Sequence, residues 1–213
     1  MIISIASGKG GTGKTTVATN LAASVKGPVQ LLDCDVEEPN AHLFLRPHIE
    51  TRHTVFTPVP EIDLDKCDGC KKCMEICRFR AITVIGDTAL AFPELCHGCG
   101  GCMAVCPHGA IQETGRELGL LEIGSAGAIA FAHGRMRIGE AMAPPLIRRV
   151  RECTASTGLT LIDAPPGTSC PVIAAMKDTD FVLLVTEPTP FGLHDLKLAV
   201  AAVKTLKIPM GLV

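Results

Sequence analysis

Short runs of consecutive apolar residues, bounded by glycine, proline or aspartate, recur along the 213-residue chain. Such runs are typical of parallel strands that are buried on both faces of a sheet. They predict strands at Met1–Ser7, Val29–Leu32, Leu159–Ile162, Phe181–Thr186 and Ile208–Val213. Apolar residues at helical spacing predict helices at Thr15–Lys26, Pro144–Ala155 and Gly192–Leu206. The alternation of strands and helices predicts an α/β fold with a mostly parallel sheet.

A different pattern occupies the middle of the chain. His42–Val59 is interpreted as a strand or linker that leaves the sheet. Gly115–Gly139, rich in glycine and alanine, is interpreted as a hairpin that returns to it. We therefore expect one discontinuous domain, residues 1–58 and 115–213, with a second, small α+β domain inserted as residues 59–114.

The predicted insert is an internal repeat that holds eight of the eleven cysteines. Asp63–Ile82 aligns with Phe92–Ile111, and each copy has the spacing C-x2-C-x2-C-x3-C. Bacterial ferredoxins with two 4Fe-4S clusters have this spacing, and the fourth cysteine of each run binds the other cluster. The ligands predicted for the first cluster are Cys67, Cys70, Cys73 and Cys106. Those predicted for the second cluster are Cys96, Cys99, Cys102 and Cys77.

Two other interpretations of these cysteines are weaker. Zinc is bound through C-x-x-C pairs, but two identical four-cysteine runs are not a zinc pattern. The other alternative is that the clusters only stabilise a module too small to build its own core. One departure from the ferredoxin pattern is visible, because Arg78 follows Cys77 whereas Pro107 follows Cys106 as expected.

Composition and charge exclude several classes of function. A formal net charge of −2 gives no electrostatic footprint for nucleic acid. The apolar runs are too short to span a bilayer, and Met1–Ser7 lacks the features of a signal peptide. Eleven cysteines without a secretion signal favour metal binding over disulfides. We expect a cytoplasmic protein without a membrane segment, and we expect His42, His48 and His53 to lie on its surface.

The strongest motif lies between the first predicted strand and the first predicted helix. Residues 8–16 read G-K-G-G-T-G-K-T-T and match the phosphate-binding loop G-x-x-x-x-G-K-S/T. Lys14 would neutralise the outer phosphates and the Thr15 hydroxyl would hold Mg²⁺. A glycine-rich turn without a ligand is disfavoured by the strand before it and the helix after it. The predicted nucleotide-binding residues are Gly8, Lys9, Gly10, Gly11, Thr12, Gly13, Lys14, Thr15 and Thr16.

Carboxylates follow two of the predicted strands, at the edge where open α/β sheets bind ligands. Asp33 and Asp35 follow the second strand in the turn D-C-D-V-E-E-P-N. Asp163 follows a later strand and opens the sequence D-A-P-P-G. An aspartate at this place is the second carboxylate on the Mg²⁺ side of a P-loop enzyme. Asp163 is therefore predicted to act on the Mg²⁺ through the metal's water shell.

The loop K-G-G-x-G-K-T-T and the two aspartate turns resemble those of MinD/ParA-type P-loop ATPases. This superfamily includes the nitrogenase iron protein and the Mrp-type iron–sulfur carriers. The resemblance implies ATP as the nucleotide, and a nucleotide-dependent homodimer in which Lys9 reaches the partner's phosphates. It implies that Asp35 orients the attacking water beside Mg²⁺, with Asp33 in support, and that Gly167 contacts the γ-phosphate. On residues alone, Lys9 is equally well a solvated loop charge.

Two further expectations rest on this resemblance. Family members continue past the last predicted strand, so we expect the chain to lack the C-terminal part of the domain. In the nitrogenase iron protein, a cysteine placed like Cys170 binds a cluster shared across the dimer. For this chain we favour the other interpretation, in which Cys170 is a small buried thiol.

Three functions agree with these observations. The first is an ATPase that couples nucleotide state to electron transfer through two 4Fe-4S clusters, with a redox protein as acceptor. The second is an ATP-dependent carrier or assembly factor that delivers iron–sulfur clusters to an acceptor protein. The third is a MinD/ParA-like positioning switch whose clusters are structural. Embedded cysteine ligands favour electron transfer, because an assembly factor needs labile, exposed ligands.

Overall fold

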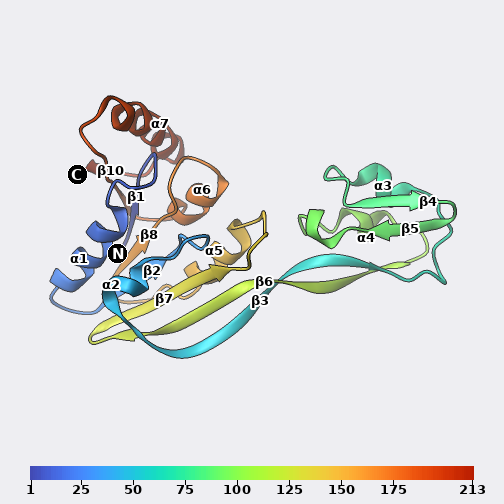
Figure 1. The fold of residues 1–213 in the computed structure, drawn as a ribbon, viewed down its shortest axis with the longest axis horizontal. Helices are drawn as coiled ribbons and strands as arrows, with labels where there is room; N and C mark the ends of the chain where they lie inside the picture. The colour runs from blue at the N-terminus through green and yellow to red at the C-terminus, as the bar shows by residue number, and fades with distance from the viewer. The chain divides into compact units, whose positions relative to one another are not determined.

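The computed structural model describes residues 1–213, which form two compact units. Unit 1 comprises Met1–Val55 and Gly119–Val213, and unit 2 comprises Phe56–Leu118. Both boundaries fall inside long strands, β3 (His48–Ile62) and β6 (Ile111–Ala126), which connect the two units along the chain (Figure 1). The unit boundaries therefore lie a few residues from the domain boundaries expected from the sequence.

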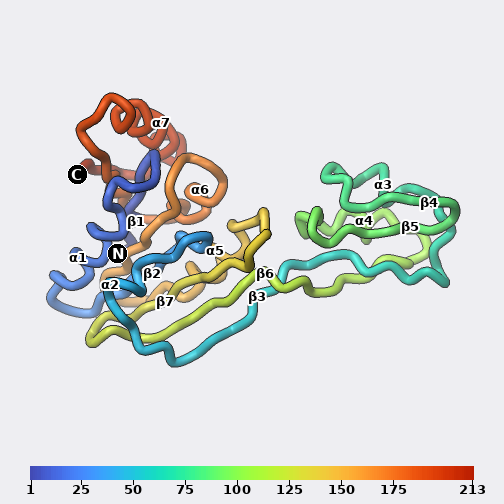
Figure 2. The backbone as a smooth tube through the Cα atoms, viewed as in Figure 1, coloured from blue at the N-terminus to red at the C-terminus, as the bar shows by residue number.

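An eight-stranded sheet has the strand order β10-β9-β1-β8-β2-β7-β6-β3. The pairs from β10 to β7 are parallel, and β6 pairs antiparallel with β7. The mostly parallel α/β sheet predicted from the sequence is therefore confirmed. Segments far apart in the chain lie side by side in it, such as β1 and β8 (Figure 2). The remaining strands are β1 (Ile2–Ala6), β2 (Val29–Asp33), β7 (Ile129–Met136), β8 (Leu159–Asp163), β9 (Phe181–Leu184) and β10 (Met210–Leu212).

Helices cover both faces of the unit 1 part of this sheet. On one face, alanines of α1 and α2 pack in a single core cluster with Leu31 and Phe131 of the sheet. On the other face, Leu146 and Val150 of α5 approach Gly134 of β7, and α6 contacts α5. The helices of unit 1 are α1 (Lys14–Ser24), α2 (Ala41–Leu45), α5 (Pro144–Arg151), α6 (Cys170–Met176) and α7 (Pro190–Leu206).

Several elements differ from the sequence-based expectation: α5 ends at Arg151, four residues early, and α2 and α7 differ for reasons that the structure shows. Residues 41–45, at the start of the expected strand or linker, form the short helix α2, and the Ala41 N–H donates to the Asp33 carboxylate. Helix α7 begins at Pro190, two residues before the expected start. Its N-cap is Thr189, whose hydroxyl accepts a 3.0 Å hydrogen bond from the Gly192 N–H, as N-cap side chains do.

Unit 2 reproduces the sequence repeat in its backbone. Equivalent positions of the two copies are 29 residues apart, as for Cys67 and Cys96. Two equivalent hydrogen bonds of 2.8 Å join the copies, from Asp63 N–H to Ala110 C=O and from Phe92 N–H to Ala81 C=O. The elements within unit 2 are α3 (Lys72–Ile76), β4 (Ile82–Ile85), β5 (Thr88–Ala91), a 3-10 turn (Pro93–Leu95) and α4 (Gly101–Val105).

Candidate functional site

The loop between β1 and α1 depends on glycine at several places. Gly11 and Gly13 have φ angles of +77° and +92°, in the left-handed region that side chains rarely adopt. A Cβ on Gly8 would lie 2.2 Å from the carbonyl oxygen of Asp195, so α7 packs directly on the loop. The hydroxyl of Thr12 is buried without a hydrogen-bond partner. This orphaned polar atom fits a loop that binds a phosphate oxygen.

Lys14, Asp163 and Asp35 come together at the carboxyl edge of the sheet. Lys14 is buried, which lowers the pKa of its ammonium group, while the charges of Asp163 and Asp35 partly offset this effect. Burial raises the pKa of Asp35 to about 6 and the pKa of Asp163 to about 6. The Thr15 hydroxyl lowers the pKa of Asp163, but neither oxygen of that carboxylate makes a hydrogen bond of ordinary geometry.

This donor set fits a hard cation. Mg²⁺ prefers oxygen ligands and is usually bound by one or two carboxylates together with substrate phosphates. The hydroxyl of Thr15 and the unpaired oxygens of Asp163 supply such ligands, and Asp35 carries a second carboxylate beside them. The three residues predicted to hold Mg²⁺ are thus neighbours in the structure.

Neutralising Asp163 is expected to stabilise the nucleotide-free protein. Its folded pKa of about 6 lies above the ordinary value of 3.8. The ionised form therefore costs stability, and this cost grows as the pH rises from about 4 through 6. Asp163→Asn should raise the melting temperature at pH 7.5, by an amount equivalent to roughly 3 kcal/mol, and less at pH 5.

The matched control is Asp178→Asn, which changes an exposed carboxylate of unit 1 and should leave the melting temperature nearly unchanged at both pH values. A lower melting temperature for Asp163→Asn at pH 7.5 would contradict the prediction. That result would mean that attraction to Lys14 outweighs the burial of Asp163.

Two contacts engage residues that the resemblance assigns to phosphates, Lys9 to those of the partner and Gly167 to the γ-phosphate. The ammonium of Lys9 forms an ion pair with Glu187, which also accepts a 2.9 Å hydrogen bond from the Thr189 hydroxyl. The Gly167 N–H donates a 3.0 Å hydrogen bond to the Ser7 carbonyl. Both groups are therefore held within unit 1, and contact with a phosphate would require these bonds to break.

A row of ionisable residues crosses the sheet from this site. Asp163 of β8 pairs in register with Asp33, Asp33 with His133, and His133 with Glu122 of β6. Asp33 is fully buried, and burial together with the nearby Asp163 charge raises the pKa of its carboxyl. Its oxygens accept hydrogen bonds of 3.1 Å from Asp35 N–H and 3.0 Å from the first N–H of α2. The Asp33 carboxylate thus holds the backbone of Asp35 and the start of α2.

Sequence reasoning missed the far end of this row. His133 and Glu122 lie in the glycine- and alanine-rich hairpin and belong to no motif, so only the strand register places them beside Asp33. His42 was expected on the surface but is half-buried, with its ring 5.2 Å from that of His133. His48 and His53 are exposed, as predicted.

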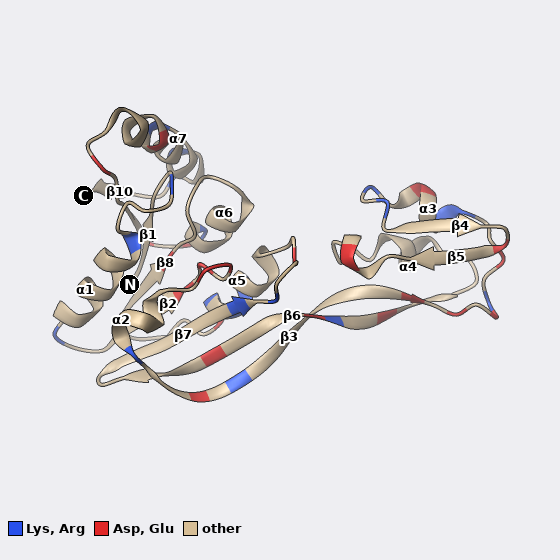
Figure 3. Ribbon diagram, viewed as in Figure 1, with Lys and Arg blue, Asp and Glu red and all other residues tan.

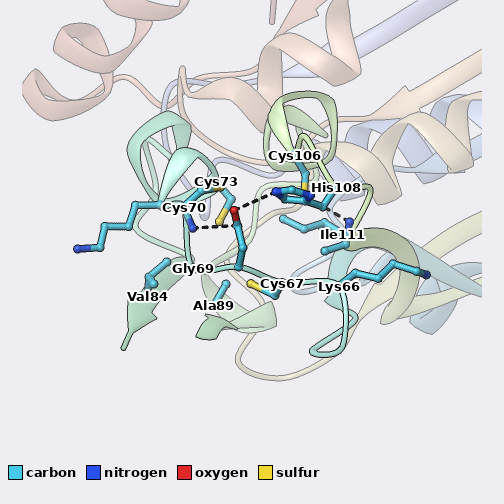
Figure 4. A pocket seen from close by; sticks show the side chains of 13 residues that line it. Lys66, Cys67, Gly69, Cys70, Cys73, Val84, Ala89, Cys106, His108 and Ile111 are labelled. Atoms are coloured by element: carbon cyan, nitrogen blue, oxygen red, sulfur yellow. Dashed lines mark hydrogen bonds and ion pairs between the residues drawn. The ribbon is translucent and has the colours of Figure 1, made fainter. Parts of the chain in front are cut away.

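The eight cysteines of unit 2 line two separate pockets, and each pocket takes cysteines from both copies of the repeat. Figure 4 shows Cys106, from the second copy, in one pocket with three cysteines of the first copy. The first pocket contains Cys67, Cys70, Cys73 and Cys106. The second contains Cys77, Cys96, Cys99 and Cys102. These are the two sets that the spacing predicts.

The surroundings of the sulfur atoms fit thiolate ligands of a cluster. Backbone N–H groups of Ala81 and Ala110 donate to Cys77 Sγ and Cys106 Sγ, each at 3.3 Å. Hydrogen bonds to sulfur are one of the features that tune cluster potentials. No three His, Cys, Asp or Glu side chains are placed so that they could together bind one metal ion. The thiolates of a cubane bind four separate irons and need not converge on one point.

The two pockets differ in the side chains beside the cysteines. In the first pocket, Asp68 accepts a 3.1 Å hydrogen bond from Cys70 N–H and lies 2.9 Å from His108 Nε2. The equivalent pair in the second pocket is His97 and Phe79, whose rings stack with centroids 3.6 Å apart. One site is therefore bordered by an Asp–His hydrogen bond and the other by an aromatic stack.

The three cysteines outside the repeat lie in unit 1. Cys170 is the first residue of α6 and is exposed, so its interpretation as a small buried thiol is wrong. Cys34 is fully buried beside Asp33, and Cys153 is half-buried.

The chain was compared with known families and proteins. The profile of the CobQ/CobB/MinD/ParA nucleotide binding domain matches residues 3–211. The chain belongs to this family. Uncharacterized protein MJ0578 of Methanocaldococcus jannaschii is 36% identical over 200 residues, which cover 92% of this chain and 70% of that protein. Uncharacterized protein MJ0579 of the same organism is 31% identical over 225 residues, covering 100% of this chain and 79% of that protein.

The fold is also similar to a solved CobQ/CobB/MinD/ParA-type structure. The septum site-determining protein MinD of Pyrococcus horikoshii OT3, solved in complex with Mg-ADP, gives a TM-score of 0.55. The match covers 99% of this chain and 68% of the MinD chain at 19% sequence identity, so the likeness concerns the fold. No helix of this MinD/ParA-family chain has the length and apolar character needed to span a bilayer.

Proposed function

We propose that this protein is an ATP-hydrolysing iron–sulfur protein that couples its nucleotide state to electron transfer through two 4Fe-4S clusters. The observation that carries the proposal is the pair of pockets in unit 2, each lined by four cysteines drawn from both copies of the repeat. This pattern is that of a bacterial-type ferredoxin domain. The clusters would supply one-electron redox chemistry.

Unit 1 supplies the residues for the nucleotide. Lys14 would bind the phosphates, while Thr15 and Asp163 would hold Mg²⁺. Asp35, with a pKa of about 6, would orient water beside the γ-phosphate. Membership of a nucleotide-binding family supports this part. MinD of P. horikoshii, which was solved with Mg-ADP, supports the choice of an adenine nucleotide and magnesium.

We further propose that ATP drives formation of a homodimer in which Lys9 acts on the partner's phosphates. In the structure Lys9 is paired with Glu187 of its own chain. Because this ion pair holds the Lys9 ammonium within its own chain, we expect dimerisation to release it from Glu187. Release of the Gly167 N–H from Ser7 would accompany contact with the γ-phosphate.

Two observations favour other functions. Cys70 and Cys99, at equivalent positions of the two runs, are exposed. Exposed ligands suit a carrier that gives up its clusters to an acceptor protein. The similarity of the fold to MinD suits a positioning switch whose clusters are structural. The experiment below separates both from electron transfer.

Anaerobically purified protein is expected to contain about eight irons per chain. ATP with Mg²⁺ should change the EPR line shape or the midpoint potential of the reduced clusters, because an electron carrier must link its nucleotide state to its redox centres. The iron content should stay unchanged after ATP turnover in the presence of an apo-ferredoxin acceptor. Iron is measured in both proteins after they are separated.

Lys14→Ala is the control, because a protein that does not bind ATP should show no EPR change upon its addition. Transfer of iron to apo-ferredoxin in step with ATP hydrolysis would replace the proposal with a cluster carrier. Eight irons with no ATP effect on EPR or potential would favour the positioning switch. Stoichiometric zinc without iron would refute all three candidate functions, because each of them assigns the cysteines to 4Fe-4S clusters.

A further inference from the structure

A polar pocket of unit 1 lies apart from the predicted nucleotide and cysteine sites. It has a volume of about 290 Å³ and is formed by α2 with the residue after it, and by β3, β6 and β7. Figure 3 shows basic segments on β3 and β7 and an acidic one on β6. The side chains that define this arginine pocket are His42, Arg46, Arg52, Glu122, His133 and Arg135.

The negative charge of the single carboxylate in the arginine pocket is already balanced by neighbouring side chains. The Glu122 side chain is only 4% exposed, and it forms ion pairs of 2.7 Å with Arg52 and 3.7 Å with Arg135. It also lies 2.7 Å from His133 Nε2. Burial opposes ionisation of Glu122, but the His133 hydrogen bond and the neighbouring arginines outweigh it, so its pKa is lowered. Glu122 is therefore an anion that its own neighbours balance.

Cationic groups remain in surplus around it. Three arginines face one carboxylate, which leaves a formal charge of +2 with the histidines counted as neutral. Arg46, just after α2, forms no ion pair, and the side chains of Arg52 and Arg135 are 68% and 58% exposed. Each guanidinium carries five N–H donors, so most of these donors have no protein acceptor.

The inner wall of the pocket also has unused polar atoms. His133 is 2% exposed, and its Nδ1 has no hydrogen-bond partner. The Nδ1 of the half-buried His42 is likewise buried without a partner. Buried polar atoms without partners are uncommon in folded proteins and call for an explanation such as a bound ligand. Here they line the same pocket as the surplus arginines.

We propose that the arginine pocket binds a small, multiply charged oxyanion, such as phosphate or a dicarboxylate, at a site separate from the P-loop. Guanidinium groups match the geometry of such oxygens and are weakly hydrated, so they pair well with them. The pocket is lined by α2, β3, β6 and β7, and its volume suits a small ion. Asp33 connects this site to the predicted nucleotide site, because it bonds both Asp35 N–H and the start of α2.

The test is calorimetric titration of the full chain in the Lys14→Ala background, which removes the P-loop as a competing anion site. Inorganic phosphate and succinate are the two probes, and they distinguish the two chemical sources of oxyanion. At least one should bind. Arg46→Gln should weaken that binding roughly tenfold, because it removes one charge-assisted contact. Arg46 has no ion pair, so this change does not leave Glu122 unpaired.

The matched control is Arg148→Gln, which removes an exposed arginine of α5 outside the pocket and should leave affinity unchanged. Arg52→Gln is a second variant with the same expected weakening. The proposal is overturned if neither probe binds in the Lys14→Ala background. It is also overturned if Arg46→Gln and Arg52→Gln both bind as tightly as their parent, since the anion would then lie elsewhere.

Discussion

The Lys14→Ala variant is expected to lose nucleotide binding, whereas Lys9→Ala should keep it and lose ATP-dependent dimerisation. Lys14 is buried at the start of α1 beside Asp35 and Asp163, where it would contact phosphates of its own chain's nucleotide. Loss of several charge-assisted hydrogen bonds should weaken binding by roughly 100-fold or more. Titration calorimetry with ATP and Mg²⁺ measures the affinity, and light scattering measures the mass.

Glu187→Gln adds an independent test of the role of Lys9. The change removes the ion pair that holds Lys9 within its own chain. If Lys9 acts on the partner's phosphates, this variant should dimerise at a lower ATP concentration than the unmodified protein. Lys26→Ala, an exposed change just after α1, is the control and should alter neither binding nor mass. Equal masses with and without ATP for both the unmodified protein and Glu187→Gln would end the sandwich-dimer hypothesis.

The elements around the P-loop could be predicted because their signals are local. Continuous apolar runs indicated β1, β2, β8 and β9, and each run ends within two residues of the strand in the structure. The glycines of the loop have a local cause as well, since Gly11 and Gly13 need positive φ angles. Gly8 is different, because a Cβ at this position would clash with Asp195 of α7, which lies far along the chain.

The short helix α2 could not be predicted, because five residues are too few to show a helical period. Its start is instead set by a tertiary contact, the hydrogen bond from Ala41 N–H to Asp33. The same limit applies to the arginine pocket. Arg52, Glu122 and His133 come from three strands, and only their pairing in the folded sheet brings them together.

The contacts of Lys9 and Gly167 illustrate a further limit. A motif indicates which residues meet a phosphate, but it does not indicate where they lie without one. In the structure these residues bond to Glu187 and Ser7, respectively, and neither partner belongs to the residues predicted for the site. Such contacts depend on the packing of α7 and of the turn after β8 against the loop.

The cysteines allowed a stronger prediction, because a fixed spacing restricts which thiols can share a cluster. The spacing divides the eight cysteines into two sets of four, and the structure places the same two sets in two pockets. The differences between the pockets were not predictable, since Asp68 and His108 in one, and His97 and Phe79 in the other, come from different copies of the repeat.

Replacing Cys106 is expected to destroy the cluster built on the first cysteine run, although Cys106 belongs to the second. Its sulfur lines the pocket of Cys67 and not that of Cys96. Cys106→Ala should therefore lower the iron content from about eight to about four atoms per chain, and Cys153→Ala, outside the repeat, should leave it unchanged. Iron is measured after anaerobic purification.

Double variants show which cluster has been lost. Cys67→Ala with Cys106→Ala should retain about four irons, because both changes damage the same cluster. Cys96→Ala with Cys106→Ala should retain almost none, because each change damages a different one. The reverse result, with iron lost from the Cys67 pair and kept in the Cys96 pair, would mean that each run binds its own cluster. The exchange of fourth ligands between the two runs would then be wrong, even if the protein carries two clusters.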